Sequence, residues 1–102
     1  MYTIEYLPIA KSDMVDIAKY IGVKLENPEA AERLAEKMIE AAEKLTDMPY
    51  KCPVYIPVKP LRHEYRKLIV QKYIMFYWVD EDKKLITIAR VVYSGRDYEN
   101  LL

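Results

Sequence analysis

The chain has 102 residues, of which 52% are hydrophobic, and this fits a single domain with one core over residues 1–102. Sixteen Lys and Arg residues balance sixteen Asp and Glu residues, so the chain as a whole has no net charge that would attract nucleic acid. No stretch has the roughly 20 apolar residues of a membrane-spanning helix. The start of the chain has neither the basic nor the apolar region of a signal peptide, so we expect a cytoplasmic protein with no membrane partner.

The charges are unevenly distributed along the chain. Between Lys59 and Lys72 five cations accompany the single acid Glu64, whereas Glu dominates from Glu26 to Glu43. We therefore expect a basic edge on a sheet and an acidic, solvated face on a helix.

The first half of the chain reads as one strand and two helices. Met1–Tyr6 has the alternating pattern of a β-strand, and a first helix is expected to open at Pro8 and to end near Gly22. A second helix is expected at Asn27-Pro28, because the asparagine can cap it and proline suits its first position. The apolar stripes are Ala10, Met14, Ile17, Ala18, Ile21 and Leu25 in the first helix, and Ala31, Leu34, Ala35, Met38, Ala42 and Leu45 in the second.

Four prolines stiffen the segment after the second helix, which we interpret as an extended connection. The only cysteine, Cys52, lies in this segment and cannot form an internal disulfide. Because His63 is also the only histidine, the sequence predicts no metal site, and nothing in it indicates a cofactor. For Cys52 a small packed side chain is favoured over a nucleophile or redox sensor. The prolines are Pro49, Pro53, Pro57 and Pro60.

Three segments rich in β-branched and aromatic residues follow, at residues 65–70, 73–79 and 85–93, with short polar breaks between them. Successive strands of this kind indicate an antiparallel meander. With the first strand and the two helices they predict an α+β domain, in which a two-helix hairpin packs on one face of a twisted, mainly antiparallel four-stranded sheet.

Short motifs along the whole chain resemble those of a known family when they are taken in order. They are Asn27-Pro28-Glu29-Ala30-Ala31, Tyr65-Arg66, Phe76-Tyr77, Arg90-Val91-Val92, Gly95-Arg96-Asp97 and Leu101-Leu102. With the order of strand, helix, helix and three strands, they resemble the RelE/ParE superfamily of bacterial toxins. The resemblance implies the toxin of a type II toxin–antitoxin module, also called a plasmid stabilisation module, whose partner is a cognate antitoxin.

Two activities occur in this superfamily. A RelE-like member is a ribosome-dependent mRNA endonuclease, or mRNA interferase, and this reaction needs a base, cations for the phosphate and an acid for the leaving oxygen. A ParE-like member inhibits DNA gyrase and is not an enzyme. The residues of a suitable type for cleavage or target binding are Arg66, Lys67, Arg90, Arg96 and Tyr98, with His63 or Glu64 as a base.

Ile74 favours the gyrase branch. Many RelE-like nucleases carry an arginine directly after the aromatic residue that opens the middle strand, and here the residue after Tyr73 is apolar. The missing cation and the zero net charge both weigh against a nuclease that must bind the ribosome and its messenger RNA. A third class, a binding or scaffold protein without toxicity, stays open.

The two strand arginines also have structural interpretations. Arg90 alternates in phase with Ile86, Ile88 and Val92, which puts a cation on an apolar face. An ion pair to an acid of the helical hairpin and a phosphate or target contact both fit this position. The same two interpretations apply to Arg66.

The remaining site residues have structural alternatives as well. His63 is expected as an exposed residue at a strand edge rather than as a base, because no orienting partner is in view. Arg96 and Tyr98 lie in a tail that is either exposed and functional or closed by Leu101 and Leu102 packing back on the sheet.

Overall fold

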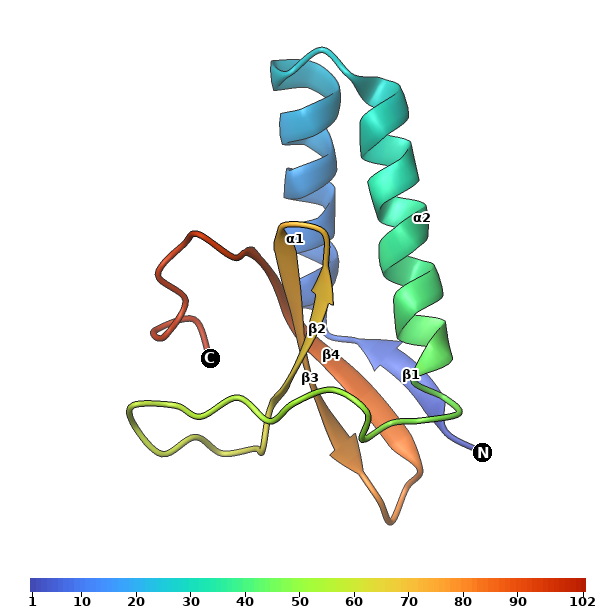
Figure 1. Ribbon diagram of the computed structural model, residues 1–102, viewed down its shortest axis with the longest axis vertical. Helices are drawn as coiled ribbons and strands as arrows, with labels where there is room; N and C mark the ends of the chain where they lie inside the picture. The colour runs from blue at the N-terminus through green and yellow to red at the C-terminus, as the bar shows by residue number, and fades with distance from the viewer.

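The computed structural model describes residues 1–102 and contains the strand, two helices and three strands expected from the sequence (Figure 1). No helix is both long and apolar enough to span a bilayer. The elements are β1 (Thr3–Tyr6), α1 (Pro8–Lys19), the π-helical turn η1 (Tyr20–Lys24), α2 (Pro28–Lys44), β2 (Arg66–Val70), β3 (Tyr73–Asp80) and β4 (Leu85–Tyr93).

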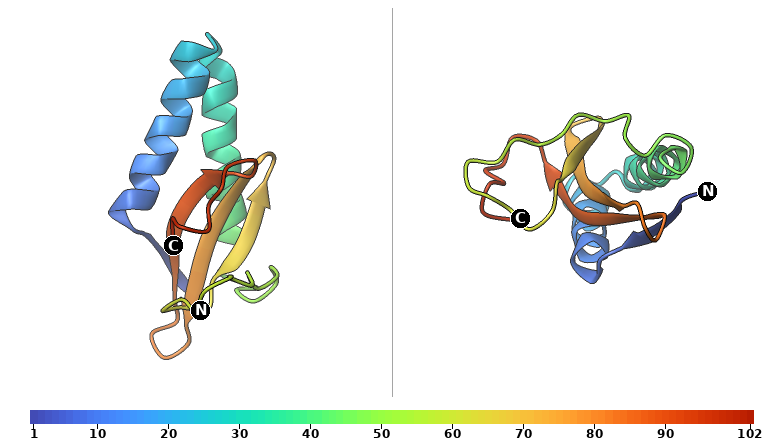
Figure 2. Two further views of the ribbon diagram at one scale, coloured as in Figure 1. Left: turned by 90° about the vertical axis from the view of Figure 1, so that its left-hand side faces the viewer. Right: turned by 90° about the horizontal axis from the view of Figure 1, so that it is seen from below.

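The four strands form one sheet in the order β1-β4-β3-β2. β2, β3 and β4 pair antiparallel, and β1 lies at the opposite edge and pairs parallel with β4. The hairpin of α1 and α2 covers one face of this twisted sheet and extends beyond its end (Figures 1 and 2). The predicted α+β architecture is confirmed.

The second helix begins and packs as the sequence predicts. Asn27 Oδ1 accepts a hydrogen bond of 3.2 Å from the Ala30 amide, and Pro28 occupies the first helical position. Such a cap satisfies one of the free amides at the helix start. The apolar stripe meets the core through Ala31, Leu34, Met38, Ala42 and Leu45, all of them buried.

The first helix departs from its predicted stripe at the C-terminal end. Leu25 was expected on the packed face, but the residue is 55% exposed. The last turn is the π-helix η1, in which the Leu25 amide donates to the Tyr20 carbonyl at 3.0 Å. A π turn holds more residues than an α turn, so it rotates the following side chains out of the stripe.

The sheet is covered on both faces, and Leu101 and Leu102 pack back on the outer face, as one of the two interpretations of the tail expected. The main core lies between the helices and the sheet, and Cys52 is packed at its edge as expected. The second core lies on the outer face, under the segment before β2 and the C-terminal tail (Figure 2). Its buried residues are Tyr65, Ile74, Phe76, Ala89 and Val92, and those packed against them include Tyr55, Leu61, Tyr98, Leu101 and Leu102.

A β-bulge in β4 changes which residues share a face. Tyr77 pairs with Ile88 and Phe76 pairs with Arg90, so Ala89 is the extra residue. Ile86 and Ile88 therefore face the helices, whereas Arg90 takes the register of Phe76 on the outer face. The predicted common face of Arg90 with the two isoleucines is wrong, because strict alternation does not hold across a bulge.

Candidate functional site

Arg90 is held by an acid of the helical hairpin. Its Nε and Nη2 atoms donate to the two Asp13 carboxylate oxygens at 2.8 and 3.0 Å, and its Nη1 donates to the Leu101 carbonyl at 3.2 Å. The Asp13 carboxylate also accepts a hydrogen bond of 2.9 Å from the Val91 amide, which lies beyond the part of β4 that pairs with β1. Both side chains of the pair are 14% exposed, and Asp13 raises the pKa of Arg90 further. Of the two interpretations of Arg90, the structural ion pair to an acid of the hairpin is therefore present.

Arg66 is held in a similar way, by the loop after α2. Its Nη1 donates to the carbonyls of Tyr50 and Cys52 at 3.1 and 2.7 Å, and its guanidinium lies over the Tyr50 ring. The nearest carboxylate oxygen, on Glu64, is 3.6 Å from Nη2. The pairing of Arg66 with Tyr77 puts it on the helix-facing side of the sheet, the opposite side from the register of Arg90. The two arginines therefore do not form one cationic site.

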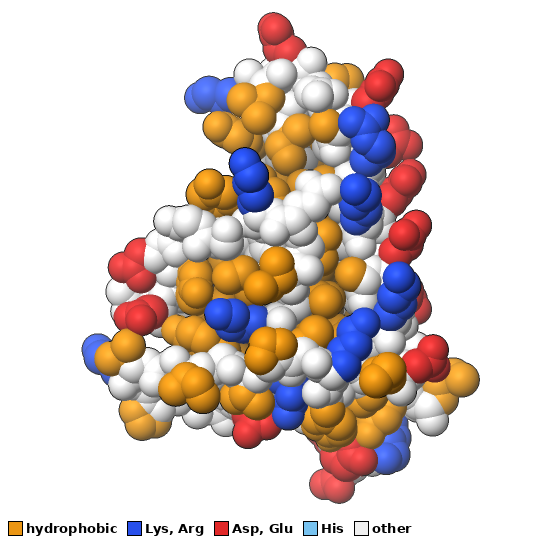
Figure 3. Space-filling view, viewed as in Figure 1, with side chains coloured by type: hydrophobic (Ala, Val, Ile, Leu, Met, Phe, Trp, Pro, Cys, Tyr) orange, Lys and Arg blue, Asp and Glu red, His pale blue; other side chains and the backbone are white.

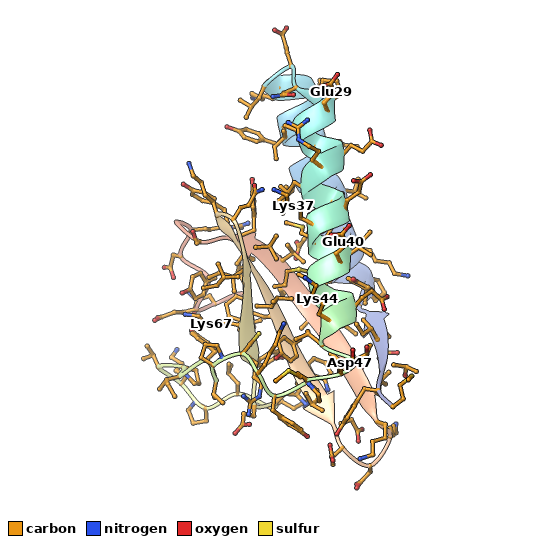
Figure 4. The ribbon with its side chains drawn as sticks, turned by 45° about the vertical axis from the view of Figure 1, so that its right-hand side comes forward. Glu29, Lys37, Glu40, Lys44, Asp47 and Lys67 are labelled. Atoms are coloured by element: carbon orange, nitrogen blue, oxygen red, sulfur yellow. The ribbon has the colours of Figure 1, made fainter.

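The two residues considered as a general base do not have the geometry of one. The His63 ring stacks on Trp78 with centroids 3.7 Å apart and planes 2° apart, so the histidine is half-buried rather than exposed as predicted. No hydrogen bond orients its ring, and the Glu64 side chain is exposed. Lys67 forms no ion pair and lies on β2, where its pairing with Phe76 puts it on the outer face of the sheet, away from the helices (Figure 4).

The C-terminal tail is packed at one predicted site residue and open at the other. The Tyr98 ring contacts Phe76 and Tyr55, with centroids 5.2 and 5.9 Å apart, so the packed interpretation of the tail applies at this residue. The ring packs on the apolar outer face of the sheet because this contact buries apolar area of both. Arg96 is exposed, as an available tail residue would be.

Arg96 belongs to a groove between the hairpin and the ends of β3 and β4. The groove has a volume of about 610 Å³ and adjoins a second hollow of about 370 Å³, with which it shares Tyr20, Leu25, Lys72 and Tyr73. Asp13 and Asp16 supply carboxylates from α1, and Lys72 and Arg96 supply cations from the sheet side. The remaining lining residues of the larger part are Ile17, Val91, Val92 and Tyr93.

The groove is apolar at its mouth, and the sequence analysis did not identify it. Tyr20, Leu25 and Tyr93 are 53%, 55% and 50% exposed, which is unusual for large apolar side chains that lie close together. A signal was present in the sequence, because Tyr20 is a large aromatic residue that falls outside the stripe of the first helix.

Charges are sorted along α2 beside this groove. A row of Lys and Arg side chains faces the viewer in Figure 3, and a row of Asp and Glu follows the outer edge of the helix, as the sequence predicted for the acids. Lys37 and Lys44 lie toward the side of β2, where Lys67 stands (Figure 4). The described residues include no group of three His, Cys, Asp or Glu side chains that could hold a metal ion.

Solved structures define the class of fold to which this arrangement belongs. The toxin–antitoxin chains that it resembles include one from the chromosomal ParDE system of P. aeruginosa, with 19% identity over 91% of this chain and 96% of that chain and a TM-score of 0.71. A chain of the archaeal RelE–RelB complex from Pyrococcus horikoshii gives 17% identity, 94% and 98% coverage and a TM-score of 0.62. A chain of the RelBE2 complex from Mycobacterium tuberculosis gives 21% identity, 90% and 96% coverage and a TM-score of 0.58.

The family follows from the sequence itself. A family model for the ParE toxin of the type II toxin–antitoxin system parDE matches residues 4–98. The chain therefore belongs to the ParE toxin family, within the RelE/ParE superfamily that the motifs predicted. None of the curated proteins matches it.

Proposed function

We propose that this protein arrests growth by inhibiting DNA gyrase, and that a cognate antitoxin neutralises it. Membership of the ParE toxin family supports a place in a type II toxin–antitoxin module. The observation that carries the choice of gyrase is that Arg66 and Arg90 are both bound by acceptors of the protein itself.

Cleavage of RNA requires groups that are free to act on the phosphate and the attacking hydroxyl. Arg66 and Arg90 would each have to leave two or more hydrogen bonds before they could bind a phosphate. Ile74, at the position where many RelE-like nucleases carry an arginine, is 3% exposed. A protein that acts by binding its target needs none of these groups to be free, so these contacts favour gyrase inhibition over an mRNA interferase.

The groove is the surface that best fits the antitoxin. Its exposed tyrosines and Leu25 offer apolar contact area, and the exposed acid Asp16 faces the groove from α1 while Lys72 and Arg96 face it from the sheet side. An amphipathic segment that lays apolar side chains between Tyr20 and Tyr93 would bury this surface and meet both signs of charge. Burial of an exposed apolar patch of this kind favours a stable complex.

Expression of the toxin without its antitoxin tests the proposal. DNA synthesis, double-strand breaks and transcript integrity are measured in the first minutes of growth arrest. A gyrase inhibitor stops replication and causes breaks while transcripts stay intact. Transcript cleavage within translated frames that precedes any DNA damage would establish an mRNA interferase instead.

A further inference from the structure

The segment between α2 and β2 carries two very exposed apolar side chains. Ile56 is 81% exposed and Val58 is 76% exposed, which places them among the most exposed large hydrophobic residues of the chain. They lie in an arm, residues 53–61, that projects from the body of the molecule on the side away from the N-terminus (Figure 1). Exposed branched side chains that lie together on a projecting segment mark a contact surface.

The base of the arm is firmly attached to the sheet. The Tyr55 amide donates to the Tyr65 carbonyl at 2.8 Å, and the Lys67 amide donates to the Pro53 carbonyl at 3.0 Å. The Tyr55 ring packs edge-on against Phe76 with centroids 5.3 Å apart. The arm is therefore anchored by backbone and side-chain contacts immediately before its exposed tip.

The tip itself has a restricted conformation. Pro57 lies between Ile56 and Val58, and Pro60 follows, so φ is fixed at two of the five positions from 56 to 60. Pro57 is half-buried while its two neighbours point outward. A rigid tip loses little conformational entropy on binding, so its apolar contacts contribute more of their free energy to affinity.

The chemistry of the arm indicates what it binds. Its apolar tip is aliphatic, and aliphatic side chains do not stack on nucleic acid bases as aromatic rings do. Lys59 and Arg62 flank the tip, are exposed and form no ion pair, although Glu99 lines the same hollow of about 240 Å³ as Lys59. A protein surface with an apolar pocket and carboxylates at its rim matches both features.

We propose that the arm docks in such a pocket on the protein target of the toxin. This inference rests on the proposed function, under which the target is DNA gyrase. The arm shares no residue with the groove, so the proposed target contact and the proposed antitoxin contact lie on separate surfaces. Loss of the arm contact must therefore leave antitoxin binding intact.

Two double variants and a matched control test the arm. Ile56→Ser with Val58→Ser removes the apolar tip, and Lys59→Gln with Arg62→Gln removes the flanking cations. The control is Val15→Ser with Ile39→Ser, which alters two helix residues that are 52% and 48% exposed and lie outside both the arm and the groove. Melting temperature, antitoxin affinity, inhibition of purified gyrase and growth arrest are measured for all variants.

The tip variant is expected to inhibit gyrase about tenfold or more less strongly, and the cation variant about threefold less strongly, with melting temperature and antitoxin affinity unchanged. The control variant should match the wild type. Unchanged inhibition by the tip variant would overturn the proposal. A large loss of inhibition with the cation variant alone would also overturn the proposal and would indicate a phosphate contact. A wild type that is dimeric, with a tip variant that is monomeric, would overturn it as well and would indicate that the arm binds a second copy of the chain.

The two proposals can fail separately. If the wild type arrests growth without inhibiting gyrase, the proposed function is wrong. Growth arrest by the tip variant then tests whether the arm binds the target protein. Arrest that disappears with the tip variant supports docking to another target protein, whereas full arrest rejects the arm. A wild type that neither arrests growth nor inhibits gyrase rejects both.

Discussion

The Asp13 carboxylate of α1 binds the Arg90 guanidinium at 2.8 and 3.0 Å and the Val91 amide at 2.9 Å. One acid thus ties the helical hairpin to β4 just beyond Ile88, the last residue of that strand paired with β1. The same arginine reaches the Leu101 carbonyl, so the tail is attached at this point as well. The pair is mostly shielded from water, which makes the loss of either partner costly.

Removal of Asp13 is expected to destabilise the fold. Asp13→Ala leaves the guanidinium and an edge amide without their acceptor, and we expect a loss of about 2 to 4 kcal/mol in the free energy of unfolding. Arg90→Met should cost less than Arg90→Ala because it keeps the side-chain volume. Urea unfolding measures these differences, with the exposed Asp16→Ala as the control. An Arg90→Met variant that is non-toxic yet as stable as the wild type would make Arg90 a target contact instead.

The tail residues are expected to respond differently to substitution. Tyr98→Ala should lower stability by about 1 to 3 kcal/mol, because the ring packs on Phe76 and Tyr55, whereas Tyr98→Phe should be neutral since no hydrogen bond of its hydroxyl is present. Arg96→Ala should not change stability, because the side chain is exposed. Thermal unfolding distinguishes these cases. A Tyr98→Phe variant that loses toxicity but keeps its melting temperature would show that the hydroxyl has a direct role.

The groove makes a prediction about antitoxin affinity. Leu25→Asp places a charge in the apolar mouth and is expected to weaken binding of the cognate antitoxin about tenfold or more. Val15→Asp is the matched control, because Val15 is similarly exposed and lies outside the groove. Titration calorimetry of the purified partners provides both affinities. Equal weakening by the two variants would place the antitoxin elsewhere.

The exposed carboxylate of Glu81 contributes to the pH dependence of stability. Glu81 accepts hydrogen bonds from Tyr2, Tyr50 and Lys84. These bonds lower the pKa of Glu81 from 4.5 to about 2, with the largest effect from Tyr2 and the smallest from Lys84. A lowered pKa stabilises the folded state above pH 4.5, and this contribution disappears as the pH falls through about 2. Melting temperatures of the wild type and of Glu81→Gln should therefore differ at neutral pH and converge toward about pH 2. A constant difference over this range would show that the pKa of Glu81 is not lowered.

The features that were predictable from the sequence depend on local pattern. The second helix follows from its cap at Asn27 and a stripe of apolar residues at helical spacing, both of which lie within one segment. The strands follow from β-branched and aromatic runs, and β3 extends one residue further, to Asp80, than the predicted 73–79. Local periodicity was sufficient for these elements because each buries its own apolar face.

The features that were missed depend on contacts between distant segments. The bulge at Ala89 arises from the pairing of β4 with β3, and no residue type in β4 indicates it. Tyr98 packs inward only because Phe76 and Tyr55 leave an apolar surface uncovered. The groove likewise needs the π turn at Tyr20–Lys24, which rotates side chains toward the sheet end in a way that an α-helical stripe does not predict.

Supercoiling by purified DNA gyrase tests the central claim most directly. The wild-type protein is added to gyrase with relaxed plasmid, with and without its antitoxin, and supercoiled product and linear DNA are measured. We expect the toxin to inhibit supercoiling and to trap cleaved plasmid, and the antitoxin to reverse both effects. Full supercoiling activity in an excess of toxin that stops growth and cuts ribosome-bound transcripts would contradict the account.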